Sequence, residues 1–455
     1  MSQESQSHYL TSLTPLDGRY HKKTDDLKVY FSEYAFIRYR LIVEIEYLIA
    51  LSKIDLVEDL TEEEIVYLKN IYQKFTVADA ESVKEIENKI KHDVKSIEYF
   101  IKMKINENSK LEEKGVSIFT HFALTSQDAN CTANILMIKT SIQKVMLPKI
   151  NNILQIIKEK ILSWSRIPML SRTHGQPASP TFLGKEFLVF YERLVIQSRK
   201  LNAIKYFTKF GGAVGNFNAH HMALPNIDWI DFANKFVNLL GLERNQYTTQ
   251  VDHYDNYGEI FDNLHRINTI MIDMCQDIWL YISQNYFLLK LNKDEVGSST
   301  MPHKINPINF ENAEGNFLLA NNLLQFFSRK LPISRLQRDL TDSTILRNVG
   351  VAFGYTLIAL KSLEEGLGKL EVNQERMEKD LQENYSVVAE GIQTRLKVLG
   401  VENSYETFKD LTRNHDGEKI GEKITSLVNS LDIEDTEKKY LNTITPLNYT
   451  GIYKL

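Results

Sequence analysis

Apolar residues recur at three- and four-residue spacing along most of this chain, and turn-forming residues are few and clustered. The longest such stretch covers residues 126–166 and is interrupted only by Pro148. The same pattern returns in four further segments, 181–210, 252–291, 308–330 and 347–370. Strand-like alternation is scarce. The pattern therefore predicts an all-α fold with a central, extended bundle of long helices.

The flanking regions have shorter helical patterns. Residues 1–115 read as a small N-terminal helical domain, in which Thr61 and Glu64 have the spacing of a capping box. Residues 116–370 hold the long helices. From residue 371 to 455 the helices become short again, with frequent charges and turns. We therefore expect three domains with these boundaries. Because the apolar seams of the long helices are wide, we also expect the chain to oligomerise through the bundle.

The composition is that of an ordinary globular protein, with 455 residues, of which 43% are hydrophobic and 25% charged. The net charge of −5 excludes a polycationic surface for nucleic acid, so an anionic ligand has to meet a local cluster of basic side chains. Cys131 and Cys275 each lie within an apolar helical pattern, which predicts two buried thiols in a reducing compartment.

The N-terminus, MSQESQSHYL, lacks the basic-then-apolar layout of a signal peptide. We also find no apolar run that approaches the ~20 residues needed to span a bilayer. These features favour a cytoplasmic protein.

Three polar, turn-rich clusters interrupt the helical pattern. In FTHFALTSQDAN, Thr125, Ser126 and Asp128 open the first long helix, and ordinary N-capping would explain them without a ligand. In MLSRTHGQPASP, His174 lies in a turn that we expect to open another long helix. A histidine there can titrate near neutrality close to helix N-terminal amides, although it could equally bond only the backbone.

The third cluster, EVGSSTMPHKINPINFENAEGN, covers residues 295–316. Gly297 permits tight backbone geometry, so that the amides of 298–300 can converge on an anion. Lys304 and Asn306 supply a charge and a donor that suit a carboxylate. A capped loop between two helices is the alternative interpretation.

Within this cluster, GSSTMPHKINP resembles the signature loop of the fumarase/aspartase superfamily, whose members release fumarate by β-elimination. The resemblance narrows to the adenylosuccinate lyase family of the bacterial type and covers essentially the whole chain. It is carried by TPLDGRY, SRTHGQPA, GAVGNFNAH, YTTQ, GSSTMPHK and QRDLTDSTILRN. It implies cleavage of adenylosuccinate to AMP and fumarate, and of SAICAR to AICAR and fumarate, without a metal or other cofactor.

The resemblance also implies roles for residues. Ser298 corresponds to the general base and His174 to the general acid, while Lys304 and Asn306 would bind the substrate carboxylate. From the chemistry alone His303 would be the better base, because a serine hydroxyl is a poor base at pH 7. Ser298 could act only if converging amides and Lys304 stabilised its alkoxide on a loop that closes over the substrate.

A second set corresponds to the family's nucleotide-contacting residues: Arg19, Tyr20, His92, Asp93, Thr125, Ser126, Gln250, Arg338, Ser343 and Arg347. Arginine suits a phosphate because its guanidinium presents a bidentate fork. One position departs from the family pattern, since Lys91 stands where relatives have asparagine, and we leave it out of the predicted site.

The superfamily further implies a homotetramer in which three subunits build each active site. Two alternatives remain. Another lyase on the same scaffold, such as argininosuccinate lyase, aspartase or fumarase, would not need His303 or the group of Arg338, Ser343 and Arg347, which fit a phosphorylated substrate. A non-catalytic scaffold protein would be expected to have lost Ser298 and the other loop residues.

Overall fold

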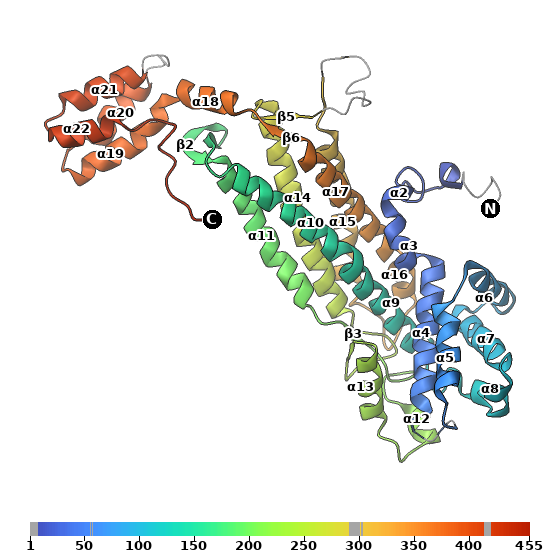
Figure 1. The fold of residues 1–455 in the computed structure, drawn as a ribbon. Helices are drawn as coiled ribbons and strands as arrows, with labels where there is room; N and C mark the ends of the chain where they lie inside the picture. The colour runs from blue at the N-terminus through green and yellow to red at the C-terminus, as the bar shows by residue number, and fades with distance from the viewer. Residues whose placement is uncertain (1–7, 55, 57, 291–300, 302–303, 414–419) are drawn as a thin grey trace. The chain divides into compact units, whose positions relative to one another are not determined.

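The computed structural model describes residues 8–54, 56, 58–290, 301, 304–413 and 420–455 (Figure 1). Among them the strands are short and most residues lie in helices, which confirms the predicted all-α class. The chain forms two compact units, each assembled from separated segments. The first unit contains residues 1–151, 197–269 and 315–361, and the second contains 152–196, 270–314 and 362–455. The three predicted domains remain a proposal.

Five long helices supply residues to both units: α10 (Leu147–Ser163), α11 (Leu183–Ala203), α14 (Asp255–Ser283), α15 (Ile308–Lys330) and α17 (Val349–Lys369). Their bounds follow the predicted segments, with ends shortened by up to eight residues. The stretch from residue 126 is divided into α9 (Ser126–Ser141), a π-helical turn (Ile142–Met146) and α10. Pro148 follows this turn. Because proline has no N–H and its ring crowds the preceding turn, it disrupts the regular hydrogen-bond ladder there.

The first unit also contains further helices, 3₁₀ turns and one pair of short strands. Its helices are α2 (His21–Thr24), α3 (Lys28–Phe31), α4 (Glu33–Leu51), α5 (Glu62–Gln73), α6 (Val77–Ile90), α7 (Asp93–Asn106), α8 (Ser109–Glu113), α12 (Asn218–Ala223), α13 (Trp229–Leu239) and α16 (Thr341–Leu346). Single 3₁₀ turns cover His8–Thr11, Asp25–Leu27 and Val116–Phe119. Strands β3 (Phe207–Thr208) and β4 (Glu243–Arg244) pair in parallel.

Helix α4 is the centre of the first unit and packs against α5, α7 and α9 (Figure 1). It begins at Ser32, whose hydroxyl accepts a hydrogen bond of 3.1 Å from the Ala35 amide. Helix α5 begins with the predicted capping box. The Glu64 carboxylate accepts from the Thr61 amide at 2.7 Å, and the Thr61 hydroxyl accepts from the Glu64 amide at 3.3 Å. Such caps satisfy amides that have no partner within the helix.

The second unit contains a β-hairpin, a second strand pair and a helical cluster. Strands β1 (Pro168–Thr173) and β2 (Gln176–Phe182) pair antiparallel, as do β5 (Phe287–Leu289) and β6 (Leu370–Val372). The helices α18 (Gln374–Glu383), α19 (Ala389–Val398), α20 (Ser404–Arg413), α21 (Ile420–Ser430) and α22 (Asp435–Asn442) follow, with a 3₁₀ turn at Tyr385–Val388. Helices α19 to α22 enclose a small apolar core of their own (Figure 1).

Two further expectations can be compared with the structure. Cys131 and Cys275 are free and buried as predicted, and burial raises the pKa of the Cys131 thiol to about 12. The segment Thr341–Lys369 is long and apolar enough to cross a membrane by length and composition, contrary to our reading of the sequence. However, 56% of its most apolar window is buried inside the protein, and the segment is divided between α16 and α17. Both features are typical of a core helix.

Candidate functional site

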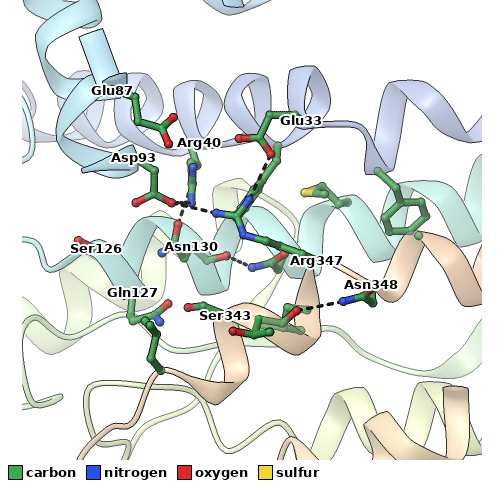
Figure 2. Close-up of a pocket in the computed structure, with 18 of the residues that line it drawn as sticks. Glu33, Arg40, Glu87, Asp93, Ser126, Gln127, Asn130, Ser343, Arg347 and Asn348 are labelled. Atoms are coloured by element: carbon green, nitrogen blue, oxygen red, sulfur yellow. Dashed lines mark hydrogen bonds and ion pairs between the residues drawn. The ribbon is translucent and has the colours of Figure 1, made fainter. Parts of the chain in front are cut away.

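The first unit contains a cavity of about 950 Å³ (Figure 2). Its walls come from α4, the junction of α6 and α7, α9, and the segment 338–350. Six of the residues predicted to contact a nucleotide line it: His92, Asp93, Ser126, Arg338, Ser343 and Arg347. The structure thus brings together four segments that lie far apart in the sequence.

Asp93 is the first residue of α7 and has a charged partner on either side. Its Oδ2 atom accepts a hydrogen bond of 2.7 Å from the Arg40 guanidinium and one of 3.3 Å from that of Arg347 (Figure 2). Burial alone would raise the pKa of Asp93, but Arg40, the Val94 amide and Arg347 outweigh it and hold the pKa below its usual value. Asp93 is therefore a fixed anion.

Arg40 was not predicted. Its side chain is only 2% exposed, and its Nε atom donates to Asn130 Oδ1 at 2.8 Å. Burial lowers the pKa of the Arg40 guanidinium and the charge of Asp93 opposes this, but an arginine remains protonated at neutral pH. The available signal was a cation on the buried side of α4, between the apolar residues Ile37 and Leu41. Such a residue needs a charged partner, which lies on another helix.

The two predicted arginines of the segment 338–350 have different hydrogen-bond partners. Arg347 donates to Glu33 at 3.2 Å as well as to Asp93. Arg338 donates to the Gln250 side-chain oxygen at 3.0 Å, and the amide of the same glutamine donates to the Ala213 carbonyl at 3.0 Å. Gln250 does not line the cavity itself. It is connected to the cavity through its hydrogen bond with Arg338, which does line it.

Asp128, which follows the predicted pair Thr125 and Ser126, forms a buried ion pair that the sequence did not reveal. Its carboxylate lies 2.6 Å from Lys209 Nζ, and both side chains are fully buried. The carboxylate also accepts from the amides of Gly211 and Gly212 and, at 2.8 Å, from that of Thr125. The N-capping interpretation is thus confirmed for Asp128. In addition, this carboxylate connects the start of α9 to the segment that contains Gly211 and Gly212.

A second buried carboxylate, Asp342, supports Ser343. It accepts from the Tyr254 hydroxyl at 2.8 Å and from the Gln127 side-chain amide at 3.3 Å, and its other oxygen accepts from the Ser343 amide at 2.7 Å. These contacts fix the start of α16. Ser343 is thereby presented to the cavity from a rigid helix.

Charge in the cavity is concentrated. Within the part of the chain that the structure describes, four cationic and three acidic residues line it: Arg40, Lys91, Arg338 and Arg347, and Glu33, Glu87 and Asp93. Lys91, which we left out of the site, is part of the wall and ends α6 with a left-handed backbone at φ 58°. His92 caps α7, and its Nδ1 atom accepts from the Lys95 amide at 3.0 Å. Convergent arginines of this kind suit a phosphate or carboxylate group.

Arg19 and Tyr20 belong to the first unit but do not line the cavity. Arg19 is exposed, and its guanidinium carbon lies 5.9 Å from the centre of the Tyr20 ring.

In the second unit, the placement of His174 corrects our expectation. It lies at the exposed tip of the β1–β2 hairpin, and α11 begins nine residues later. His174 and Gly175 form the two-residue turn with φ of 53° and 73°, a geometry that matches the twist of an antiparallel pair. The alternation in SRTHGQPASP was too short to distinguish from a loop. The hairpin is anchored near its tip by Arg172, which donates to Asp380 at 2.7 Å.

The signature loop lies largely outside the described residues. Ser298 and His303 lie outside the described residues. Lys304 is exposed, with its amide 3.0 Å from the Met301 carbonyl, and Asn306 is half-buried. Among the described residues, no group of three or more His, Cys, Asp and Glu is arranged to hold a metal ion.

Comparisons with known proteins identify the family of the chain. Residues 18–318 match the model of a family described as "Lyase", and residues 334–450 match one described as "Adenylosuccinate lyase C-terminal". The chain is 50% identical over 456 residues to the adenylosuccinate lyase of Dictyostelium discoideum, covering 98% of both proteins. It is 44% identical over 446 residues to that of Escherichia coli K12, covering 97% of both.

Among solved structures, a fumarate lyase from Mesorhizobium sp. BNC1 is similar with a TM-score of 0.74 at 16% identity, over 94% of this chain and 95% of the other. A β-carboxy-cis,cis-muconate cycloisomerase from Acinetobacter calcoaceticus gives 0.71, also at 16% identity and with the same coverage. At such identities the likeness shows the fold alone. The family matches and the full-length identities establish that the chain belongs to the adenylosuccinate lyase family, within the fumarase/aspartase superfamily of lyases.

Proposed function

We propose that this protein splits adenylosuccinate into AMP and fumarate, and SAICAR into AICAR and fumarate, as an enzyme of purine biosynthesis. The observation that carries the proposal is full-length identity of 44–50% to adenylosuccinate lyases, together with an arginine-lined cavity where the nucleotide-contacting residues were predicted. We place the reaction in the cytoplasm.

The chemistry requires a proton to leave the succinyl carbon next to a carboxylate while a C–N bond breaks. We assign Ser298 as the base and His174 as the acid that protonates the departing nitrogen. Histidine suits this role because its usual pKa lies near neutrality. The intermediate is a doubly charged aci-carboxylate, so Lys304 and Asn306 act by stabilising negative charge that grows during the reaction.

In this proposal a separate group of residues binds the nucleotide part of the substrate. Arg338, Ser343 and Arg347 surround the 5′-phosphate, and His92, Asp93 and Ser126 complete the wall. The arrangement in one cavity supports this assignment, since a dianionic phosphate gains most from the bidentate hydrogen bonds of arginines. Arg19, Tyr20, Thr125 and Gln250 belong to the same proposed nucleotide site. A substrate without a phosphate, such as aspartate or malate, would not use these arginines.

We propose also that the protein is a homotetramer and that three subunits build each active site. Large apolar side chains remain exposed on long helices, including Val189 and Ile196 on α11 and Leu318, Leu319 and Phe326 on α15. Such side chains are expected to be covered by further copies of the chain. A stable monomer with full turnover would contradict this assembly.

A substrate panel on the purified protein tests the reaction. Adenylosuccinate, argininosuccinate, aspartate and malate are supplied separately, and fumarate formation is followed by absorbance. We expect fumarate from adenylosuccinate alone. Turnover of another substrate would refute the nucleotide assignment, and no turnover from a folded tetramer would favour a non-catalytic scaffold.

The catalytic assignments are tested by Ser298→Ala and His174→Ala. Each is expected to abolish turnover while the circular dichroism spectrum and the assembly state stay unchanged, because both positions are taken to act in the chemical step rather than in packing. An active Ser298→Ala protein would return the base role to His303.

A further inference from the structure

Arg40 occupies a position where a charge needs a specific reason. It lies in the middle of α4, and its side chain is 2% exposed. Transferring a charged group such as a guanidinium out of water costs roughly several kcal/mol unless charged and polar partners replace the solvent. The two partners of Arg40, Asp93 and Asn130, both line the cavity. The side chain therefore connects the core of α4 to the wall of the proposed nucleotide site.

The contact with Asp93 is shared. Arg40 approaches Asp93 Oδ2 to 2.7 Å, whereas Arg347 approaches the same oxygen atom to 3.3 Å (Figure 2). Arg40 has the shorter hydrogen bond and the buried position, where charge–charge interactions are least screened. Arg40 consequently interacts with the Asp93 carboxylate more strongly than Arg347 does. Arg347 is 45% exposed and keeps donors for another anion.

Phe36 fixes Arg40 in this position. The guanidinium carbon of Arg40 lies 3.7 Å from the centre of the Phe36 ring, and that of Arg347 lies 5.6 Å from it. Stacking on an aromatic face restrains a planar guanidinium and favours its charged form. Asn130 Oδ1 holds the Nε atom at 2.8 Å from another side. Arg40 is thus restrained by three side chains.

We propose that Arg40 is a positioning residue of the active site: it holds Asp93 in place and competes with Arg347 for its charge, which leaves Arg347 available to the phosphate of the substrate. This role rests on the proposed function, because it assumes that Arg347 binds an anionic group of the nucleotide. Without Arg40, Asp93 would turn to Arg347 and neutralise it. The loss would fall on binding, since the phosphate is remote from the C–N bond that breaks.

The test is a steady-state comparison of Arg40→Met and Arg40→Lys with the wild type, using adenylosuccinate. A hydrogen bond between charged groups is worth about 1.5–3 kcal/mol, so Arg40→Met should raise KM by about tenfold or more, with kcat changed less than about threefold. Arg40→Lys should recover part of the loss because it restores the charge without the fork. Arg38→Met is the matched control. Arg38 is a half-buried arginine of the same helix that donates to the Tyr72 carbonyl at 3.0 Å and does not line the cavity, so its KM should stay unchanged.

A double-mutant cycle keeps the proposal refutable even if Arg40→Met lowers stability. In an Asp93→Asn background, Arg40→Met should change KM by less than about threefold, because residue 93 then carries no charge that could capture Arg347, and the Glu33 contact of Arg347 is common to all the variants. Equal effects of Arg40→Met in both backgrounds would overturn the positioning role, as would a KM unaffected by Arg40→Met in an active enzyme. A wild type that releases no fumarate from adenylosuccinate would instead refute the proposed function itself.

Discussion

His220 is expected to make this protein sensitive to mild acid. The imidazole is 1% exposed and packs edge-on against the rings of Phe217, Phe122 and Trp229. Its Nε2 atom lies 3.2 Å from the Tyr47 hydroxyl, which itself donates to the Phe122 carbonyl at 3.1 Å, so Nε2 carries the proton. The Nδ1 atom is buried and has no hydrogen-bond partner among the described residues. A second proton would therefore be added to an atom with no acceptor.

Burial accordingly lowers the pKa of His220 to about 4, from an ordinary value of 6.5. The neutral form is favoured in the folded state, so its contribution to stability is complete above pH 6.5 and is lost as the pH falls towards 4. Over this window the unfolded chain binds the proton and the folded protein does not. Linkage between these two pKa values predicts a loss of about 2 kcal/mol in the free energy of unfolding between pH 7.5 and pH 5.

The assay is urea unfolding of the wild type and of His220→Gln at pH 7.5 and pH 5.0, at one protein concentration because assembly also contributes to stability. Glutamine keeps a donor for the Tyr47 hydroxyl but does not titrate. The wild type should lose about 2 kcal/mol more than the variant over this change of pH. If both proteins lose the same amount, the account of His220 is wrong.

His121 changes the stability with pH in the opposite direction to His220. The comparison of the wild type with His220→Gln removes this effect. Burial alone would lower the pKa of His121, but the Glu44 carboxylate, 2.6 Å from Nδ1, outweighs it and raises that pKa. Its contribution is complete below pH 6.5 and is lost as the pH rises through the raised value. Because His121 is present in both proteins, it changes their stabilities equally.

Two further substitutions test the support of the cavity. Lys209→Met should lower the free energy of unfolding by about 3–5 kcal/mol, because it leaves the buried Asp128 carboxylate without its cation, and the double variant with Asp128→Asn should be more stable than the single one. Chemical denaturation at neutral pH measures both, and a double variant no more stable than the single would contradict the reasoning. Gly215→Ala should cost more than about 2 kcal/mol, because a Cβ atom would lie 2.2 Å from the Thr248 carbonyl oxygen at a φ of 81°. In contrast, Gly368→Ala in α17 meets no atom of the described residues within 4 Å and should stabilise the protein slightly, so similar losses at both glycines would refute the steric explanation.

Local signals in the sequence were sufficient for the helical architecture. Three- and four-residue spacing located the long helices, and the cap at Thr61 and Glu64 has the predicted hydrogen bonds. These features depend on residues at most a few positions apart, whose contacts follow from the geometry of one helix. The β1–β2 hairpin was missed because its strands are short and a two-residue turn at His174 resembles a loop in the sequence.

Motif resemblance identified six residues that line the cavity, yet it did not identify their supports. In the sequence, Arg40 is a charged residue within an apolar helical pattern, and Lys209 cannot be distinguished from a surface lysine. Each has its carboxylate partner on another element, 53 residues from Arg40 in one case and 81 from Lys209 in the other. The sequence by itself determined the helices, the family and the charged groups available for an anion. Only the tertiary structure decided which carboxylate each buried cation meets, because that pairing depends on packing between distant segments.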